Sequence, residues 1–189
     1  MSRVLSMLKI FFQPDNLLVY LTNHIISRVL FSNARLMWYR QVMGFKIGKK
    51  TSILRDFKVS RSGNLEIGDH TVINNSCQFD NRFPIKIGSN VSITYGTSIF
   101  TKGHDIDDAL FRTKGAGVII EDYVWIAAYA LILPGVTLGR GSVVLPGSVV
   151  TKSTEAFQIV GGNPATFVRE RNRNLNYELY WDPWFPFWG

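Results

Sequence analysis

Residues 120–155 read IEDYVWIAAYALILPGVTLGRGSVVLPGSVVTKSTE, and every sixth position from Ile120 to Val150 is aliphatic. An amphipathic helix repeats its apolar face every three or four residues and a half-buried strand every two, so neither explains a spacing of six. A short repeated unit cannot bury its apolar side alone and must stack on its neighbours. The stretch therefore predicts a solenoid.

The same period runs through the preceding part of the chain. Three trios of apolar residues, each displaced by twenty residues from the last, are Ile47, Ile53 and Val59, then Ile67, Ile73 and Phe79, then Ile87, Ile93 and Ile99. The fourth position after each is usually small, and Gly, Asn or Asp recur where a turn needs positive φ. This pattern predicts an all-β fold, a triangular prism with three short strands per coil.

Several of these blocks resemble a known family. IGDHTV (67–72), ILPGVT (132–137), LGRGSV (138–143), VLPGSVVTK (144–152) and GGNPATFVRE (161–170) are similar to the hexapeptide-repeat acyltransferases, especially the maltose, galactoside and colanic-acid O-acetyltransferase branch. The resemblance covers about residues 47–170. It implies a left-handed parallel β-helix, a homotrimer with active sites between subunits, and acetyl-coenzyme A (acetyl-CoA) as co-substrate.

The chain divides into three segments within one globular unit. Residues 1–46 are expected to form an N-terminal helical cap, because Leu18, Leu21, Ile25 and Val29 follow helical spacing after a start signal at Pro14. Residues 47–156 are expected to form the β-helix, with an extruded loop at about 102–117. Residues 157–189 are expected to form a C-terminal helix and an aromatic tail.

Composition and charge narrow the class of protein. The single cysteine excludes an internal disulfide and gives no zinc-ligand spacing, which favours a cytoplasmic protein without a metal. The longest uncharged run near the start, between Asp15 and Arg28, is far short of the roughly 20 residues that span a bilayer. Residues 1–62 carry 11 Lys and Arg against 2 Asp and Glu, whereas residues 63–189 carry 10 against 12.

Two interpretations of the basic N-terminal part and the aromatic tail stay open. The basic residues are a solvated face, or they attract an anionic glycan or the inner face of a membrane, where the protein would lie peripherally. The tail YWDPWFPFWG (180–189) packs against the protein or anchors it at a membrane interface. No nucleic-acid recognition motif accompanies the charge.

The repeat breaks after Ile99, where TKGHDIDDALFRTKGAG (101–117) interrupts it. Excursions from a rigid scaffold are preferred places for chemistry. Gly103 and His104 stand at its start and resemble the family segment that supplies the catalytic base. A neutral imidazole can remove the hydroxyl proton as an alcohol attacks a thioester. Asp105, a backbone carbonyl or a residue of another subunit could orient the ring.

The resemblance also implies residues for the two substrates. On the acceptor side, Asn74 falls where sugar acetyltransferases carry an asparagine, Asp80 and Asn81 resemble a DN pair of the colanic-acid proteins, and Arg82 replaces an acid of the galactoside enzymes. Arg82 would favour a carboxylate or phosphate on the acceptor. The alternative for the last three is turn chemistry. The donor side comprises Trp125, Ala127, Ala128, Pro146, Gly147, Thr151, Lys152 and Arg169.

The leading hypothesis is therefore an acetyl-CoA-dependent O-acetyltransferase acting on a sugar hydroxyl, in surface polysaccharide (capsule, O-antigen or exopolysaccharide) biosynthesis, with His104 as general base. Three alternatives stay open: an N-acetyltransferase of an amino sugar, a non-catalytic trimeric scaffold, and a metal-dependent hydratase. The last would need paired histidines, and the chain holds only three histidines, none of them five apart.

Overall fold

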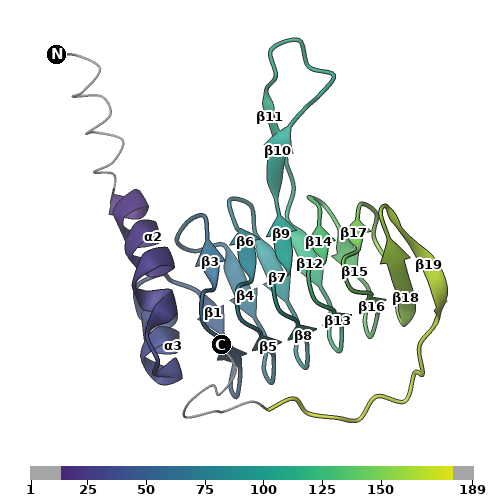
Figure 1. Cartoon of the computed structure of the whole chain (residues 1–189), viewed down its shortest axis with the longest axis horizontal. Coiled ribbons are helices and arrows are strands. Elements are labelled where there is room, and N and C mark those ends of the chain that lie inside the picture. The colour runs from purple at the N-terminus through teal and green to yellow at the C-terminus, as the bar shows by residue number, and fades with distance from the viewer. Residues whose placement is uncertain (1–13, 181–189) are drawn as a thin grey trace.

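The computed structural model describes residues 14–180, which form a three-sided parallel β-solenoid with a helical cap (Figure 1). Each coil contributes one short strand to each of three faces, which we call A, B and C. Face A contains β1 (Lys46–Ile47), β4 (Leu65–Ile67), β7 (Ile85–Ile87), β12 (Val118–Ile120) and β15 (Thr137–Leu138). Face B contains β2 (Ser52–Ile53), β5 (Val72–Ile73), β8 (Ser92–Ile93), β13 (Trp125–Ile126), β16 (Val143–Val144), β18 (Gln158–Gly162) and β19 (Ala165–Glu170). Face C contains β3 (Lys58–Val59), β6 (Gln78–Asp80), β9 (Ser98–Phe100), β14 (Leu131–Ile132) and β17 (Val149–Val150).

The period-six prediction is confirmed in register. Ile53 pairs with Ile73 and Ile73 with Ile93 on face B, and on face C Ile99 pairs with Ile132. These side chains are fully buried, so each column of aliphatics forms one side of a continuous core. The solenoid is stabilised by this stacking rather than by any single coil.

The small residues inside the prism connect adjacent coils. The hydroxyl of Thr51 donates to the carbonyl of Gly68 at 2.7 Å and accepts from the backbone N–H of Thr71 at 3.1 Å. Thr71 repeats both bonds one coil further, to Gly88 and Val91. A buried hydroxyl is tolerated only with such partners, which explains threonine at these positions.

Three edges separate the faces, named AB, BC and CA after the faces they join. Several edge residues have positive φ, including bulky ones such as Tyr123 and Tyr129, both at 60°. The turn signals Gly, Asn and Asp do not predict these two. Their backbone N–H groups donate to carbonyls of the preceding coil, at Ser89 and Tyr95. The ladder between coils therefore imposes the conformation on whichever residue falls there.

The predicted N-terminal helices cover the first coil. They are α2 (Pro14–His24) and α3 (Ser32–Gln41), joined by the short 3-10 helix η1 (Ile26–Arg28). Asn23 pairs with Val59 like a strand neighbour, since its Nδ2 donates to the carbonyl at 2.8 Å and its Oδ1 accepts from the N–H at 3.0 Å. The cap thus closes an edge of face C that would otherwise be open. Neither helix is long and apolar enough to cross a membrane.

The predicted C-terminal helix is wrong for the described residues. Residues 158–170 form an antiparallel hairpin of β18 and β19. Ile159 and Val160 pair with Val143 and Val144, so β18 begins a further coil and β19 covers its edge. Residues 171–180, which we call the strap, then run back along the AB edge. The aromatic tail lies outside the described residues, except for Tyr180.

Candidate active site

A β-hairpin leaves the prism at the CA edge and carries His104. It consists of β10 (Lys102–His104) and β11 (Thr113–Gly115), with His104 opposite Thr113 (Figure 1). Gly115 lies where the hairpin returns to the prism, and a Cβ there would be 2.5 Å from the carbonyl oxygen of Thr101 and 2.6 Å from the ring of Phe83. The hairpin is therefore fixed tightly at its base.

The imidazole of His104 is oriented by the hairpin itself. Its Nδ1 lies 2.8 Å from the carbonyl oxygen of Phe111, and the two rings stack with centroids 4.2 Å apart and planes 6° from parallel. A carbonyl oxygen can only accept, so Nδ1 must carry the proton. Nε2 then keeps its lone pair on an exposed side chain. Of the three orienting groups left open by the sequence, the structure has the backbone carbonyl.

Asp105 is engaged elsewhere. Its carboxylate pairs with Lys114 at 3.1 Å, and the hydrogen bond from Lys114 lowers the pKa of Asp105. Asp108 pairs in the same way with Arg112, which lowers its pKa. Both ion pairs join the two sides of the hairpin, so the acids stiffen the segment rather than contact the imidazole.

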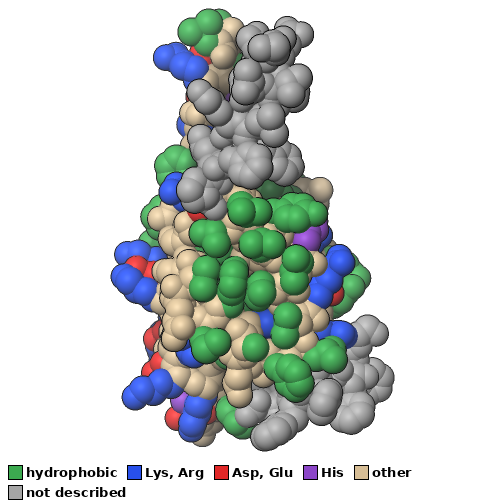
Figure 2. All heavy atoms as spheres, turned by 90° about the vertical axis from the view of Figure 1, so that its left-hand side faces the viewer, with side chains coloured by type: hydrophobic (Ala, Val, Ile, Leu, Met, Phe, Trp, Pro, Cys, Tyr) green, Lys and Arg blue, Asp and Glu red, His purple; other side chains and the backbone are tan. Residues whose placement is uncertain are grey.

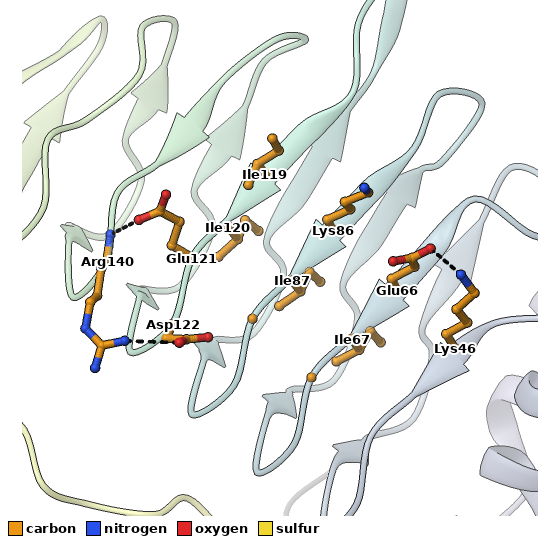
Figure 3. A pocket seen from close by; sticks show the side chains of 12 residues that line it. Lys46, Glu66, Ile67, Lys86, Ile87, Ile119, Ile120, Glu121, Asp122 and Arg140 are labelled. Atoms are coloured by element: carbon orange, nitrogen blue, oxygen red, sulfur yellow. Dashed lines mark hydrogen bonds and ion pairs between the residues drawn. The ribbon is translucent and has the colours of Figure 1, made fainter.

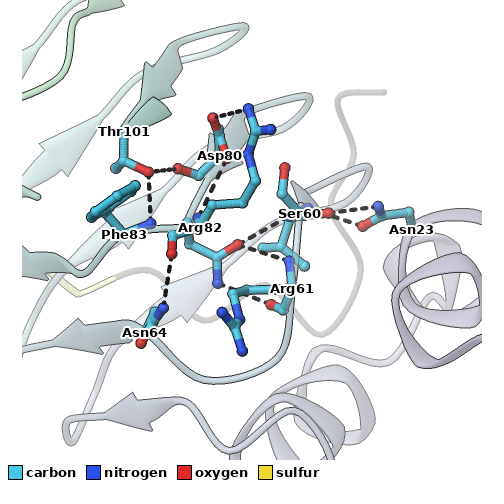
Figure 4. Close-up of polar contacts among 10 residues, drawn as sticks. Asn23, Ser60, Arg61, Asn64, Asp80, Arg82, Phe83 and Thr101 are labelled. Carbon is cyan, nitrogen blue, oxygen red and sulfur yellow. Dashed lines mark hydrogen bonds and ion pairs between the residues drawn. The ribbon is translucent and has the colours of Figure 1, made fainter. Parts of the chain in front are cut away.

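The four residues predicted for the acceptor separate into different environments. Asp80 and Arg82 form a two-point ion pair at the CA edge, with Nε to Oδ1 and Nη2 to Oδ2 both 2.7 Å (Figure 4). The Asp80 side chain is 3% exposed and the Arg82 side chain 47%. Burial disfavours the charged carboxylate, but the hydrogen bonds from Arg82 outweigh it and hold the pKa of Asp80 below its usual range.

Two predictions for this turn are therefore corrected. Arg82 already has a carboxylate partner within the chain, so it does not present an uncompensated charge to an acidic acceptor. Asn81 is fully buried and faces the preceding coil. Its Oδ1 accepts from the N–H groups of Ser60 and Arg61, and its Nδ2 donates to the carbonyls of Arg61 and Gly63 (Figure 4). Its amide has no hydrogen-bonding capacity left for a ligand.

Asn74 lies on a different edge of the prism. It follows β5 at the BC edge, and its Oδ1 accepts from the N–H of Asn75 at 2.7 Å. The side chain is half-buried. Asn74 and His104 are thus separated within one chain by the width of face C.

Most predicted donor residues share the BC edge with Asn74. Trp125 is half exposed on face B, and its indole donates to Thr94 at 3.2 Å. Ala127 and Ala128 form the next turn of the edge, and Pro146 and Gly147 stack on it one coil later, where the N–H of Gly147 donates to Ala128. The side chains of this column are small at Ala127, Ala128 and Gly147, and the exposed Tyr129 follows Ala128.

Thr151, Lys152 and Arg169 lie near the end of the solenoid. Thr151 and Lys152 follow β17 at the CA edge and line a pocket of about 310 Å³ against Thr166 and Phe167 of β19. Arg169 is exposed on the same strand, where its Nη1 donates to the carbonyl of Glu170. Lys152 lines this hollow, whereas Arg169 lies two residues beyond Phe167 on the same strand and is not part of its lining.

A larger hollow than the one beside Lys152 lies elsewhere on the prism. A shallow depression of about 530 Å³ crosses face A, with Lys46, Glu66, Lys86 and Arg140 around it (Figure 3). Lys46 pairs with Glu66 at 2.7 Å and Arg140 with Asp122 at 3.0 Å. None of the predicted site residues lines it, and its paired charges provide no acid, base or nucleophile directed at one point.

The single cysteine, Cys77, does not suit the role of a covalent nucleophile. Cys77 is buried in the core, and burial raises the pKa of its thiol to about 12, so the reactive thiolate is absent at neutral pH. No cluster of three His, Cys, Asp or Glu side chains capable of holding a metal exists within residues 14–180.

Sequence reasoning missed Phe111, the residue that orients His104. It has a φ of +48°, and its carbonyl oxygen lies 2.8 Å from Nδ1 of the imidazole. No sequence signal marks it, because a phenylalanine in the left-handed region looks like any exposed loop residue.

Comparison with known proteins identifies the family to which the chain belongs. Residues 117–152 match the family model described as bacterial transferase hexapeptide (six repeats). The putative colanic acid biosynthesis acetyltransferase WcaF of Escherichia coli is 31% identical over 131 residues, covering 69% of this chain and 72% of that protein. The chain belongs to the hexapeptide-repeat transferase family.

Solved structures of similar proteins agree with the fold of this hexapeptide-repeat transferase. A hexapeptide-repeat acetyltransferase of Vibrio cholerae, solved with acetyl-CoA, has a TM-score of 0.75 and 31% identity over 81% of this chain and 85% of its own. A maltose O-acetyltransferase of Clostridium difficile also has a TM-score of 0.75, with 29% identity over 85% and 91% of the two chains. The resemblance drawn from the repeats is confirmed.

Proposed function

We propose that this transferase moves the acetyl group of acetyl-CoA to a sugar hydroxyl, with Nε2 of His104 as the general base. The observation that carries the proposal is the bond from Nδ1 to the carbonyl of Phe111, which places the lone pair of the neutral ring on Nε2 of an exposed side chain. The acceptor hydroxyl attacks the thioester carbonyl as His104 takes its proton. The tetrahedral intermediate then expels the CoA thiolate, which the imidazolium can protonate, so the base is regenerated.

The donor is proposed to lie along the BC edge. Trp125, Ala127, Ala128, Pro146 and Gly147 provide a narrow track for the pantetheine arm. Thr151 and Lys152, which lie at the CA edge, and Arg169 are proposed for its phosphates, with the CA edge supplied by the neighbouring subunit. The acetyl-CoA complex of the Vibrio cholerae protein supports a CoA ligand on this scaffold.

The acceptor is proposed to be the sugar of a surface polysaccharide. The similarity to WcaF and to maltose O-acetyltransferase supports a sugar. Asn74 stays a proposed acceptor contact, whereas Asp80 and Arg82 are proposed to shape the CA edge beside the hairpin as a neutral pair. A neutral pair favours an uncharged sugar over an acidic one, which replaces the expectation drawn from Arg82 alone.

The site is proposed to be completed by a second chain. Within one chain the base lies at the CA edge and the donor track at the BC edge, on opposite sides of face C. A closed homotrimer would bring the CA edge of one subunit to the BC edge of the next, because a heterologous contact repeats around a threefold axis.

An acceptor panel tests the function directly. Release of free CoA would be followed with a thiol reagent in the presence of acetyl-CoA and neutral sugars, acidic sugars or amino sugars. We expect turnover with a neutral sugar, and a loss of about 10²- to 10⁴-fold in kcat for His104→Ala with the KM for acetyl-CoA little changed. Full activity of His104→Ala would exclude the proposed base. Turnover only with amino sugars would indicate N-acetylation.

A further inference from the structure

The outer side of the helical cap is apolar and exposed. Tyr20, Phe31 and Met37 are 53%, 63% and 57% exposed. Leu17, Ile25, Leu30 and Val42 are also exposed. Figure 2 looks onto this end of the molecule and shows hydrophobic side chains gathered across its middle. We call these seven side chains the cap patch.

The cap patch is not required by the fold. The inner side of α3 already buries Leu36 and Tyr39 in the core, and Leu18 and Val19 of α2 pack against it, so both helices already have the inward-facing apolar side chains that a surface helix needs. A shallow apolar depression of about 240 Å³ between η1 and α3, lined by Val29, Met37 and Trp38 among others, adds to the exposed apolar surface. Contiguous apolar surface of this kind on a folded protein marks an interaction site.

Cationic side chains surround the first coil, directly beneath the cap. Lys49 and Lys50 lie at the AB edge, Lys58 projects from face C and Arg61 lies at the CA edge. All four are exposed, and none takes part in a salt bridge among the residues that the structure describes. We call these four residues the basic collar. Figure 2 shows Lys and Arg side chains at both flanks of the apolar surface.

The carboxylates of the cap and the first coil each have a partner within the chain. Residues 14–62 contain two carboxylates, Asp15 and Asp56. Asp56 pairs with Arg28 at 3.1 Å, and Asp15 accepts from the N–H of Ser62 at 3.2 Å. The cap and the first coil are therefore apolar at their centre and carry a net positive charge around it, with Asp69 of the second coil beside Lys49. This distribution complements a surface with negative headgroups over an apolar layer.

The strap leads toward the same end of the prism. Arg171 donates to the carbonyls of Tyr123 and Gly141, and Leu179 contacts the second coil through His70 and the third through Asn90. The chain thus returns from the last coil to one coil from the cap.

We propose that the cap patch and the basic collar form a docking surface for an anionic lipid bilayer. The apolar side chains enter the boundary between headgroups and acyl chains, and the collar cations lie against the headgroups. A second copy of this chain fits less well, because packing two cap patches together would bring two basic collars into apposition. The inference concerns a surface away from His104 and does not rest on the proposed acyl transfer.

Vesicle co-sedimentation tests this surface with the full chain. We expect binding to vesicles of phosphatidylcholine with phosphatidylglycerol, and at least about tenfold weaker partitioning onto pure phosphatidylcholine or at high salt. The double variant Phe31→Glu/Met37→Glu should lose binding by at least about tenfold. Both residues are exposed, so circular dichroism should show an intact fold.

Two further variants separate the contribution of the cap patch from a general effect of added charge, and from the contribution of the basic collar. Ile106→Glu/Leu110→Glu makes the same charge change at residues that are 87% and 77% exposed on the hairpin, and it should bind vesicles as the wild type does. Lys49→Gln/Lys50→Gln/Lys58→Gln should lose the preference for phosphatidylglycerol.

Several outcomes would overturn the proposal. They are an absence of wild-type binding, equal binding of the cap-patch variant, or an equal loss in the hairpin control. A concentration-dependent association in sedimentation velocity that Phe31→Glu/Met37→Glu abolishes would identify a second copy as the occupant.

Discussion

The imidazole of His104 and the carbonyl of Phe111 form a 2.8 Å hydrogen bond across the tip of a two-stranded hairpin. One backbone group therefore fixes both the ring orientation and the tautomer of the proposed base. The same residue stacks its ring on the imidazole. Phe111 thus contributes through two separable features, a carbonyl and an aromatic ring.

Two substitutions of Phe111 separate these features. Phe111→Gly removes the ring but accepts the φ of +48°, whereas Phe111→Val removes the ring and resists that conformation. A β-branched residue there costs on the order of 1–3 kcal/mol, so the aligned hairpin should be about 5- to 150-fold less populated. We expect kcat to fall more in Phe111→Val than in Phe111→Gly. Equal losses would indicate that the stacking alone matters.

The tautomer itself can be observed. Imidazole nitrogen resonances of ¹⁵N-labelled protein should show a protonated Nδ1 and an unprotonated Nε2 at His104, because the Phe111 carbonyl accepts only from a proton on Nδ1. The resonances of His104 would be assigned by their loss in His104→Ala. A protonated Nε2 in the neutral ring would contradict the proposed base.

Two asparagines in neighbouring turns should respond differently to alanine. Asn81→Ala removes four hydrogen bonds to the preceding coil and should lower the free energy of unfolding by about 2–4 kcal/mol. Asn74→Ala should cost less than about 1 kcal/mol and should instead raise the KM for the acceptor.

Denaturant unfolding and steady-state kinetics measure both effects, and Asn81→Asp is the matched control. It keeps the acceptor oxygen for Ser60 and Arg61 but places a buried carboxylate oxygen against the carbonyls of Arg61 and Gly63, so a stability loss at least as large as that of Asn81→Ala is expected at neutral pH. A large stability loss in Asn74→Ala would reverse the assignment of the two residues.

The ion pair of Asp80 and Arg82 makes stability depend on pH. Because the folded pKa of Asp80 lies below its ordinary value, its contribution is full above the unfolded pKa of about 3.9 and is lost as pH falls through the folded pKa. Asp80→Asn should lower stability at pH 7 by about 1–3 kcal/mol and should flatten the acid limb of the stability curve. Glu66→Gln breaks an exposed pair with Lys46 and should leave the Tm within error.

The repeats alone predict most of the prism, because the core of a solenoid follows one period in the sequence. Residues such as Ile73 and Ile93 stack because the chain turns three times per coil, so their spacing in the sequence predicts the solenoid. The strands after Val150 do not follow the six-residue period. GGNPATFVRE continues the coil with β18 and then reverses into β19, and no six-residue period distinguishes that hairpin from the predicted helix.

The candidate site is less predictable, because the role of each side chain depends on whether its turn faces a neighbouring coil or the solvent. Asn81 and Asn74 both occupy turns in the sequence, yet one is buried against Ser60 and Arg61 and the other is half-buried at the BC edge. Arg82 looked available for an anion, but its neighbour Asp80 folds back onto it. His104 was recognisable because a histidine interrupts the repeat, whereas the carbonyl that orients it belongs to a residue without a signature.

Subunit mixing tests whether two chains build each site. His104→Ala damages the CA edge, and Ala128→Glu should block the donor track at the BC edge. Each homo-oligomer should be inactive. Random mixing of equal amounts, by refolding together, should give about a quarter of the wild-type activity, since one contact in four joins an intact CA edge to an intact BC edge. A site contained in one chain would give no recovery, because every chain then carries a defect. The fraction recovered therefore distinguishes a shared site from an internal one.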